Sequence, residues 1–210
     1  MSLTNFFKIL QLSRVQPQNG YQPAVRSKGE VSDLAQHHYL VTMLAWQLAR
    51  ASSKTGAKVN VERVLELALL HDIGELFGGD INFYYARSRP KVREAAKAFQ
   101  KETEQYLTDF FGNDKEYMGK LFEENAKKET NEAIIARIAD HLECLYYKSF
   151  AGVVGTQQKD ALAILKQNCK RAPDKRVAKV LANFVIETEK ALKDNDLESI
   201  IWKGHQNLVD

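Results

Sequence analysis

Apolar residues recur every three or four positions along most of this chain, which is the period of a helix with one buried face. Prolines and a Gly-Gly pair fall between these stretches and mark their ends. The pattern predicts helices over residues 3–13, 32–51, 61–76, 90–111, 117–126, 131–150, 160–169 and 174–201. It also predicts a loop over residues 16–29 and an irregular segment over 80–89. We therefore expect an all-α fold.

The length of 210 residues suits one well-buried domain. We expect a single helical bundle over residues 1–210, with a core over about 30–150 and C-terminal helices over about 160–201 packing on it. No apolar run approaches the roughly 20 residues that span a bilayer, so no membrane association is expected. The first residues lack a basic start followed by a long apolar core, which indicates a cytoplasmic protein rather than a secreted one.

Charge and cysteine usage narrow the class of partner. The formal net charge of +3 is slight, so it argues against a nucleic-acid polymer as partner but is compatible with a local anion site. Cys144 and Cys169 form no Cys-x-x-Cys motif, which argues against a zinc finger or a disulfide framework. Both are compatible with a reducing compartment.

Four polar residues interrupt the apolar faces of three predicted helices. His37 shares a face with Val41, and His71-Asp72 ends the apolar run that begins at Leu67. Asp140 lies on a line of small residues. Burying two histidines and two aspartates costs several kcal/mol unless they are compensated. One divalent metal ion compensates all four, and a mixed nitrogen and oxygen set suits Mn, Fe, Co, Ni, Zn or Mg.

Each of these residues also has a structural interpretation when taken alone. A histidine on an apolar face is usually a hydrogen-bonded core residue. Asp140 could pair with Arg137, three positions earlier on its own helix. His38 is a rival to His37, but the two lie about 100° apart around a helix, and the apolar periodicity favours His37 as the inward residue.

Further charged residues lie near the predicted metal site in sequence. Glu75 follows His71 by four residues, so a continuous helix would place both on one face. A carboxylate there could orient water or move its proton. Asp80 could bind a sugar hydroxyl or cap a turn, and Arg26 could hold a phosphate or be an ordinary loop charge. A basic cluster follows, which is either a solvated face or an anion-attracting rim: Arg87, Arg89 and Lys91.

The order His, His-Asp, Asp on successive helices resembles the HD-domain superfamily of metal-dependent phosphohydrolases. His71-Asp72-x-x-Glu75 followed by Gly79-Asp80 resembles the small bacterial branch that includes the 5′-deoxynucleotidases, over about residues 5–150. The resemblance implies a homodimer with one divalent metal ion per site that removes the 5′-phosphate of deoxynucleoside monophosphates. It implies these roles: His37, His71, Asp72 and Asp140 as metal ligands, Glu75 as acid/base, Asp80 near the sugar or in catalysis, and Arg26 near the phosphate.

The sequence departs from this branch around the first histidine. The branch commonly has an acidic residue before that histidine and a small polar residue after it, where this chain has Gln36 and His38. The loop that carries Arg26 is also spaced differently. A phosphodiesterase or pyrophosphohydrolase remains an alternative, as does a nucleotide-binding regulatory module without turnover. The Gly-Tyr-Pro signature of the cyclic-dinucleotide branch is absent after the His-Asp pair.

Overall fold

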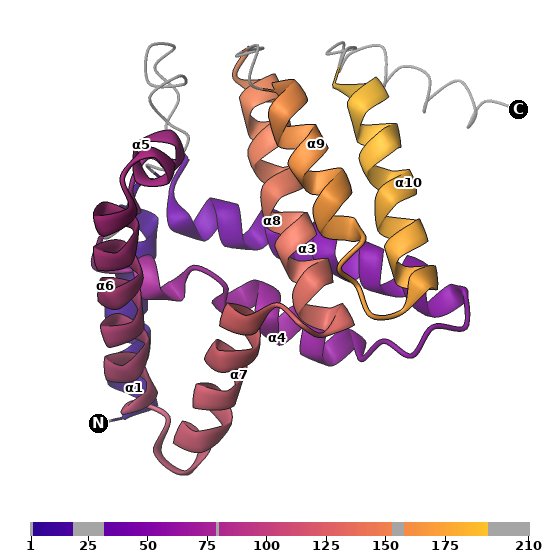
Figure 1. Ribbon diagram of the computed structural model, residues 1–210. Coiled ribbons are helices and arrows are strands. Elements are labelled where there is room, and N and C mark those ends of the chain that lie inside the picture. Colours follow the sequence, from indigo (N-terminus) through magenta and orange to yellow (C-terminus); the bar gives the residue numbers. More distant parts are fainter. Residues whose placement is uncertain (1, 19–31, 79, 153–157, 193–210) are drawn as a thin grey trace, which may run out of the picture.

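The computed structural model describes residues 2–18, 32–78, 80–152 and 158–192, and in this part of the chain the regular secondary structure is helical (Figure 1). The expected all-α fold is confirmed. The α-helices and 3₁₀ turns (η) are α1 Leu3–Leu10, η1 Gln11–Arg14, α3 Leu34–Lys54, α4 Val61–Leu70, η2 Ile73–Glu75, α5 Phe83–Ser88, α6 Pro90–Thr108, η3 Gly112–Asp114, α7 Lys115–Lys127, α8 Asn131–Phe150, α9 Gln158–Cys169 and α10 Lys175–Ala191.

Three mutually packed helices, α3, α4 and α8, form the centre of the fold. On one side α9 packs on α8, and α10 lies beside both (Figure 1). On the other side α6 packs on η2 and α7. The inward positions of α3 and α4 are fully buried, as their periodicity predicts: Val41, Leu48, Val64, Leu67 and Ala68. None of the helices in the described residues is long and apolar enough to cross a membrane.

The helix predicted over residues 61–76 is shorter than expected. Asn60 caps its start by accepting a hydrogen bond from the backbone N–H of Arg63, but α4 ends at Leu70. The carbonyl oxygen of His71 accepts a hydrogen bond from Nδ2 of Asn125 on α7 at 3.0 Å. The N–H of Glu75 bonds to the carbonyl of Asp72 instead, which begins the 3₁₀ turn η2. Glu75 is therefore not on a continuous helix with His71, so the expectation of one shared face is wrong.

The segment over residues 80–89 was expected to be irregular, and this is wrong in part. It contains the short helix α5, whose start is capped by Asn82 accepting a hydrogen bond from the N–H of Tyr85. Pro90 then opens α6, a position where its missing N–H costs nothing. The predicted end of the last helix at residue 201 lies outside the described residues, since α10 is described to Ala191.

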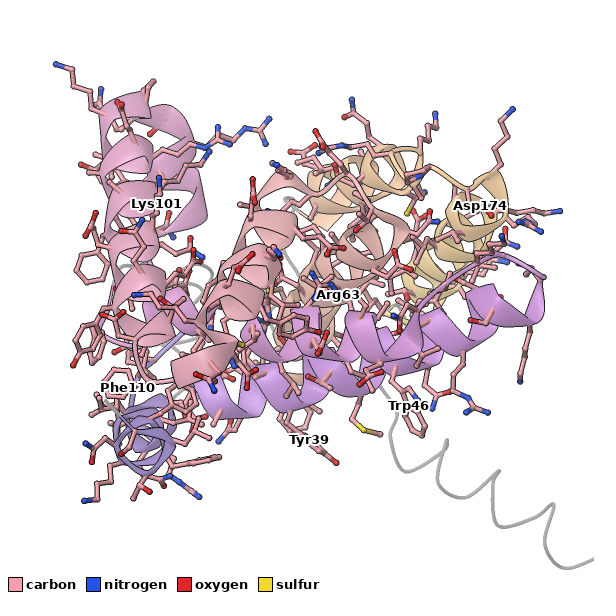
Figure 2. All side chains as sticks on the ribbon, turned by 90° about the horizontal axis from the view of Figure 1, so that it is seen from below. Tyr39, Trp46, Arg63, Lys101, Phe110 and Asp174 are labelled. Carbon is pink, nitrogen blue, oxygen red and sulfur yellow. The ribbon has the colours of Figure 1, made fainter. Side chains whose placement is uncertain are left out.

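The buried face of α6 also differs from the sequence pattern. The apolar positions of the sequence over residues 90–111 predict a core face made of Ala95, Phe99, Tyr106 and Phe110. The first three are exposed, so that prediction is wrong for them, whereas Phe110 is buried as predicted. Phe110 lies beside α1, with its ring centroid 6.4 Å from that of Phe6 (Figure 2). The face that α6 turns inward is set by its contact with η2.

Candidate metal centre

Four polar side chains from three elements meet at the centre of the fold. α3 supplies His37, the turn after α4 supplies His71 and Asp72, and α8 supplies Asp140. One ligand-type atom from each lies within 4.8 Å of the others. His37, His71 and Asp140 are buried and Asp72 is partly buried. The structure thus brings together the four residues that the sequence selects as metal ligands.

The facing atoms are close enough to share one cation. Nε2 of His37 lies 3.1 Å from Nε2 of His71, 3.6 Å from Oδ2 of Asp72 and 3.5 Å from Oδ1 of Asp140. Nε2 of His71 lies 3.3 Å and 3.9 Å from the same two oxygens. Ligands about 2.1 Å from one metal ion lie about 3.0 Å apart at right angles and about 4.2 Å apart when opposite. These residues therefore fit a divalent metal ion, and its identity is not selected by them.

Both histidines are oriented by a second contact through Nδ1. Nδ1 of His37 lies 2.6 Å from Oε2 of Glu143, a buried residue of α8. Nδ1 of His71 lies 2.8 Å from the carbonyl oxygen of Ala68. An ionised carboxylate and a carbonyl oxygen can only accept, so we assign the proton to Nδ1 in each ring. In this tautomer the lone pair of Nε2 in both rings faces the metal site.

Asp140 makes two contacts at once. Its Oδ2 accepts a hydrogen bond from Arg137 at 2.7 Å, while its Oδ1 faces the histidines. The ion pair considered from sequence as an alternative is therefore present together with the inward contact. The hydrogen bond from Arg137 to Oδ2 thus favours the orientation of the carboxylate in which Oδ1 faces the two histidines.

The electrostatics of the cluster favour positive charge between its members. Burial alone would raise the pKa of Asp72 and of Asp140. For Asp72 this effect is outweighed by His71 and His37, so its pKa falls below the ordinary range. For Asp140 it is outweighed by Arg137 and His37, with the same result. Burial lowers the pKa of His37, but Asp140, Asp72 and Glu143 outweigh it and hold that pKa well above its usual value. Two carboxylates that stay ionised inside the fold suit a bound cation.

Glu75 and Asp80 border the cluster. Burial raises the pKa of Glu75 well above its ordinary value, and the negative charges of Asp72, Asp80 and Asp140 raise it further. Glu75 and Asp80 line a pocket of about 140 Å³ together with residues of α6. Glu75 therefore lines the pocket with a carboxylate of raised pKa that interacts electrostatically with Asp72 and Asp140 of the cluster.

Other sequence-selected residues lie elsewhere. Arg26 lies outside the described residues, so its expected role toward phosphate stays a prediction. His38 is not part of the cluster, and its ring centroid lies 4.8 Å from that of His71. Burial lowers the pKa of His38 to about 3, which keeps the ring neutral. The inward residue of this pair is His37, as the periodicity predicts.

Three residues near the cluster were not selected from the sequence. Glu143 follows Asp140 by one helical turn in an apolar stretch, and that position was a usable signal. Arg93 and Lys97 line the pocket with Glu75 and Asp80. On their own helix they resemble part of a solvated face, so their position depends on how α6 packs.

Comparisons with known proteins agree on one family. A family model described as HD domain matches residues 23–182. The curated 5′-deoxynucleotidase YfbR of Salmonella paratyphi B is 31% identical over 150 residues, which cover 70% of this chain and 72% of that protein. YfbR of Salmonella newport matches to the same extent.

Solved structures show the same fold. A conserved hypothetical protein from Pyrococcus furiosus has a TM-score of 0.68 at 22% identity, covering 89% of this chain and 99% of that one. An HD-domain phosphohydrolase from Listeria innocua has a TM-score of 0.67 at 22% identity, covering 99% and 100%. At such identities these likenesses concern the fold, and they support the all-α architecture built around the cluster.

Proposed function

This chain belongs to the HD-domain family, and from that premise we propose that it is a metal-dependent phosphohydrolase that releases the 5′-phosphate of nucleoside or deoxynucleoside monophosphates. The observation that carries the proposal is the convergence of His37, His71, Asp72 and Asp140 beside Glu75. The similarity to a 5′-deoxynucleotidase supports the choice of substrate class.

The four converging residues would hold one divalent ion. Such an ion, when bound, supplies positive charge that polarises a phosphoryl oxygen and makes water a better nucleophile. The contribution of this chain is the rigid donor set. Glu143 and the Ala68 carbonyl hold the two imidazoles in one tautomer, and Arg137 holds Asp140.

Glu75 would act as the acid/base residue of the reaction. Its raised pKa makes its carboxylate a stronger base than an exposed glutamate, so it can take a proton from the attacking water. It can then give that proton to the departing 5′-oxygen of the sugar. Asp80, which lines the same pocket, would contact the sugar or assist the transfer. A homodimer is expected from the family resemblance and stays a prediction.

The test is phosphate release from a panel of ribo- and deoxyribonucleoside 5′-monophosphates with Co²⁺, Mn²⁺, Ni²⁺, Zn²⁺ or Mg²⁺. Glu75→Gln should lower kcat by about 100-fold or more while the protein still binds metal, the range expected for loss of a general acid/base. Glu102→Gln, at an exposed position of α6, is the matched control and should retain activity.

The same panel separates the alternatives. A phosphodiester and a nucleoside triphosphate are included in the panel. Hydrolysis of either compound without phosphate release from the monophosphates would indicate a phosphodiesterase or a pyrophosphohydrolase instead. Nucleotide binding without release under any metal would indicate a regulatory module and overturn the proposed activity.

A further inference from the structure

One face of α6 is turned toward Glu75. Arg93, Lys97 and Gln100 are spaced by four and three residues, so they share a face of this helix. The contact with η2 shows where that face points. A Cβ built on Gly74 would lie 2.4 Å from Cγ of Gln100 and 3.0 Å from its backbone oxygen. The face that carries Arg93 and Lys97 therefore lies on the side of the turn that holds Glu75.

The pocket between these elements has opposite charges on its walls. Glu75 and Asp80 lie on one side, and Arg93, Lys97 and Gln100 lie on the other. Arg63 and Arg137 are held in ion pairs at 2.7 Å, with Glu124 and Asp140. Within the described part of the chain, no such pair is formed by Arg93 or Lys97. Their hydrogen-bond donors are thus available to a ligand in the pocket.

Lys128 is a third cation in this part of the fold, and its charge interacts with that of Lys97. It ends α7 with φ 54°, in the left-handed region that a lysine rarely adopts. It is partly buried and lies within electrostatic range of Lys97, Arg137, Asp140 and Asp72. Cations held near one another in this way are stabilised when an anion binds between them.

We propose that Arg93 and Lys97 bind the phosphate group of the substrate. This inference rests on the proposed function and names the residues that recognise its substrate. A guanidinium can donate two parallel hydrogen bonds to phosphate oxygens, and an ammonium acts as a point charge beside it. The basic cluster Arg87, Arg89 and Lys91 does not line this pocket.

The first test measures binding of inorganic phosphate by calorimetry, with metal-free protein and with Mn²⁺-loaded protein. Arg93→Ala and Lys97→Ala should each raise the Kd for phosphate about tenfold, the loss expected for one charge-assisted hydrogen bond near solvent. Lys101→Ala is the matched control, because Lys101 is an exposed cation of the same helix that does not line the pocket (Figure 2). It should leave the Kd unchanged.

The second test measures hydrolysis of a nucleoside monophosphate. Each pocket variant should raise KM about tenfold and change kcat less, and Arg93→Lys should recover part of the loss. An Arg93→Ala/Lys97→Ala double variant that is folded by circular dichroism and binds phosphate as the wild type does would overturn the inference. Weaker binding in Arg26→Ala together with unchanged binding in the double variant would also overturn it.

The two proposals fail in different ways. If wild-type protein binds phosphate through Arg93 and Lys97 but releases none from any monophosphate, the anion site is supported and the proposed function is wrong. If hydrolysis proceeds and neither KM nor phosphate affinity depends on these residues, the proposed function is supported and the anion site is wrong.

Discussion

Glu143 on α8 and Nδ1 of His37 on α3 meet at 2.6 Å across 106 residues of sequence. The contact has a function that the sequence around His37 does not supply, because Gln36 occupies the position where the resembled branch commonly has an acid. A carboxylate at Nδ1 fixes the imidazole tautomer and makes Nε2 a better donor to a metal ion. Glu143 is therefore a positioning residue for His37.

Glu143→Gln should weaken metal binding by about 10- to 100-fold, the usual loss when the partner of a ligating histidine is replaced. Glu143→Ala should weaken it at least as much, since the buried Nδ1–H would then lack an acceptor. Calorimetric titration with Mn²⁺ measures the Kd. Glu123→Gln, an exposed position on α7, is the control and should bind metal as the wild type does. Equal affinities in all four proteins would show that Glu143 does not orient the ligand.

Gly74 allows η2 to lie directly against α6. Gly74→Ala would place a methyl group 2.4 Å from Cγ of Gln100 and 3.0 Å from the Gln100 backbone oxygen, so the Gln100 side chain must move and the turn and the helix must shift slightly apart. We expect a loss of about 1–3 kcal/mol in the free energy of unfolding, as for other overpacked contacts. Glu75 follows directly, so kcat should fall as well. Urea denaturation and steady-state kinetics measure the two effects.

Gly119→Ala is the matched control for this variant. Gly119 lies in α7 at an exposed position, and a Cβ added there would meet nothing within 4 Å. Alanine there should stabilise the protein by about 0.5–1 kcal/mol, since glycine is unfavourable inside a helix. A Gly74→Ala protein as stable and as active as the wild type would contradict the close contact.

Metal binding should stabilise the fold, because the ligands come from three different elements. A ligand present at about 100 times its Kd adds about 2.7 kcal/mol to the free energy of unfolding when it binds the folded state alone. Mn²⁺ should therefore raise the melting temperature of the wild type. Asp72→Ala removes one ligand and its charge, so this protein should show little or no shift and should not retain stoichiometric metal by elemental analysis. A full shift in Asp72→Ala would remove Asp72 from the ligand set.

The sequence predicts the four-residue cluster because polar side chains on apolar helical faces are conspicuous in a periodic pattern. His37, His71 and Asp140 lie on such faces, and the structure buries all three. The all-α fold follows from the same periodicity. What the sequence shows less well is any feature that depends on a distant partner.

Two such features are the end of α4 and the role of Glu143. Where α4 ends, the His71 carbonyl accepts a hydrogen bond from Asn125 on α7, a partner 54 residues away in sequence. Glu143 accepts a hydrogen bond from a ring 106 residues away. Neither partner is implied by local spacing. The same holds for Arg93, whose place beside Glu75 depends on the packing of α6 on η2.

Lys128 links stability to pH. Its pKa falls from an ordinary value of 10.5 to about 8, because the lowering by burial, Arg137 and Lys97 exceeds the opposing effect of Asp140 and Asp72. Between these two values the unfolded chain binds a proton that the folded chain does not, so the free energy of unfolding due to this group rises with pH. Below about pH 8 both states are protonated, and the cost of the buried charge is fully present.

Lys128→Met removes this charge and keeps a long side chain at the same left-handed position. At pH 7 the variant should be more stable than the wild type by on the order of 1–2 kcal/mol. This is less than the full pKa shift of Lys128 corresponds to, because the side chain is partly exposed. The gain should shrink as pH rises from 8 toward 10.5, because the wild-type lysine becomes neutral in the folded state first. Urea unfolding at about pH 7 and about pH 10 measures the difference, and a gain that is equal at both would show that the charge of Lys128 is not the cause.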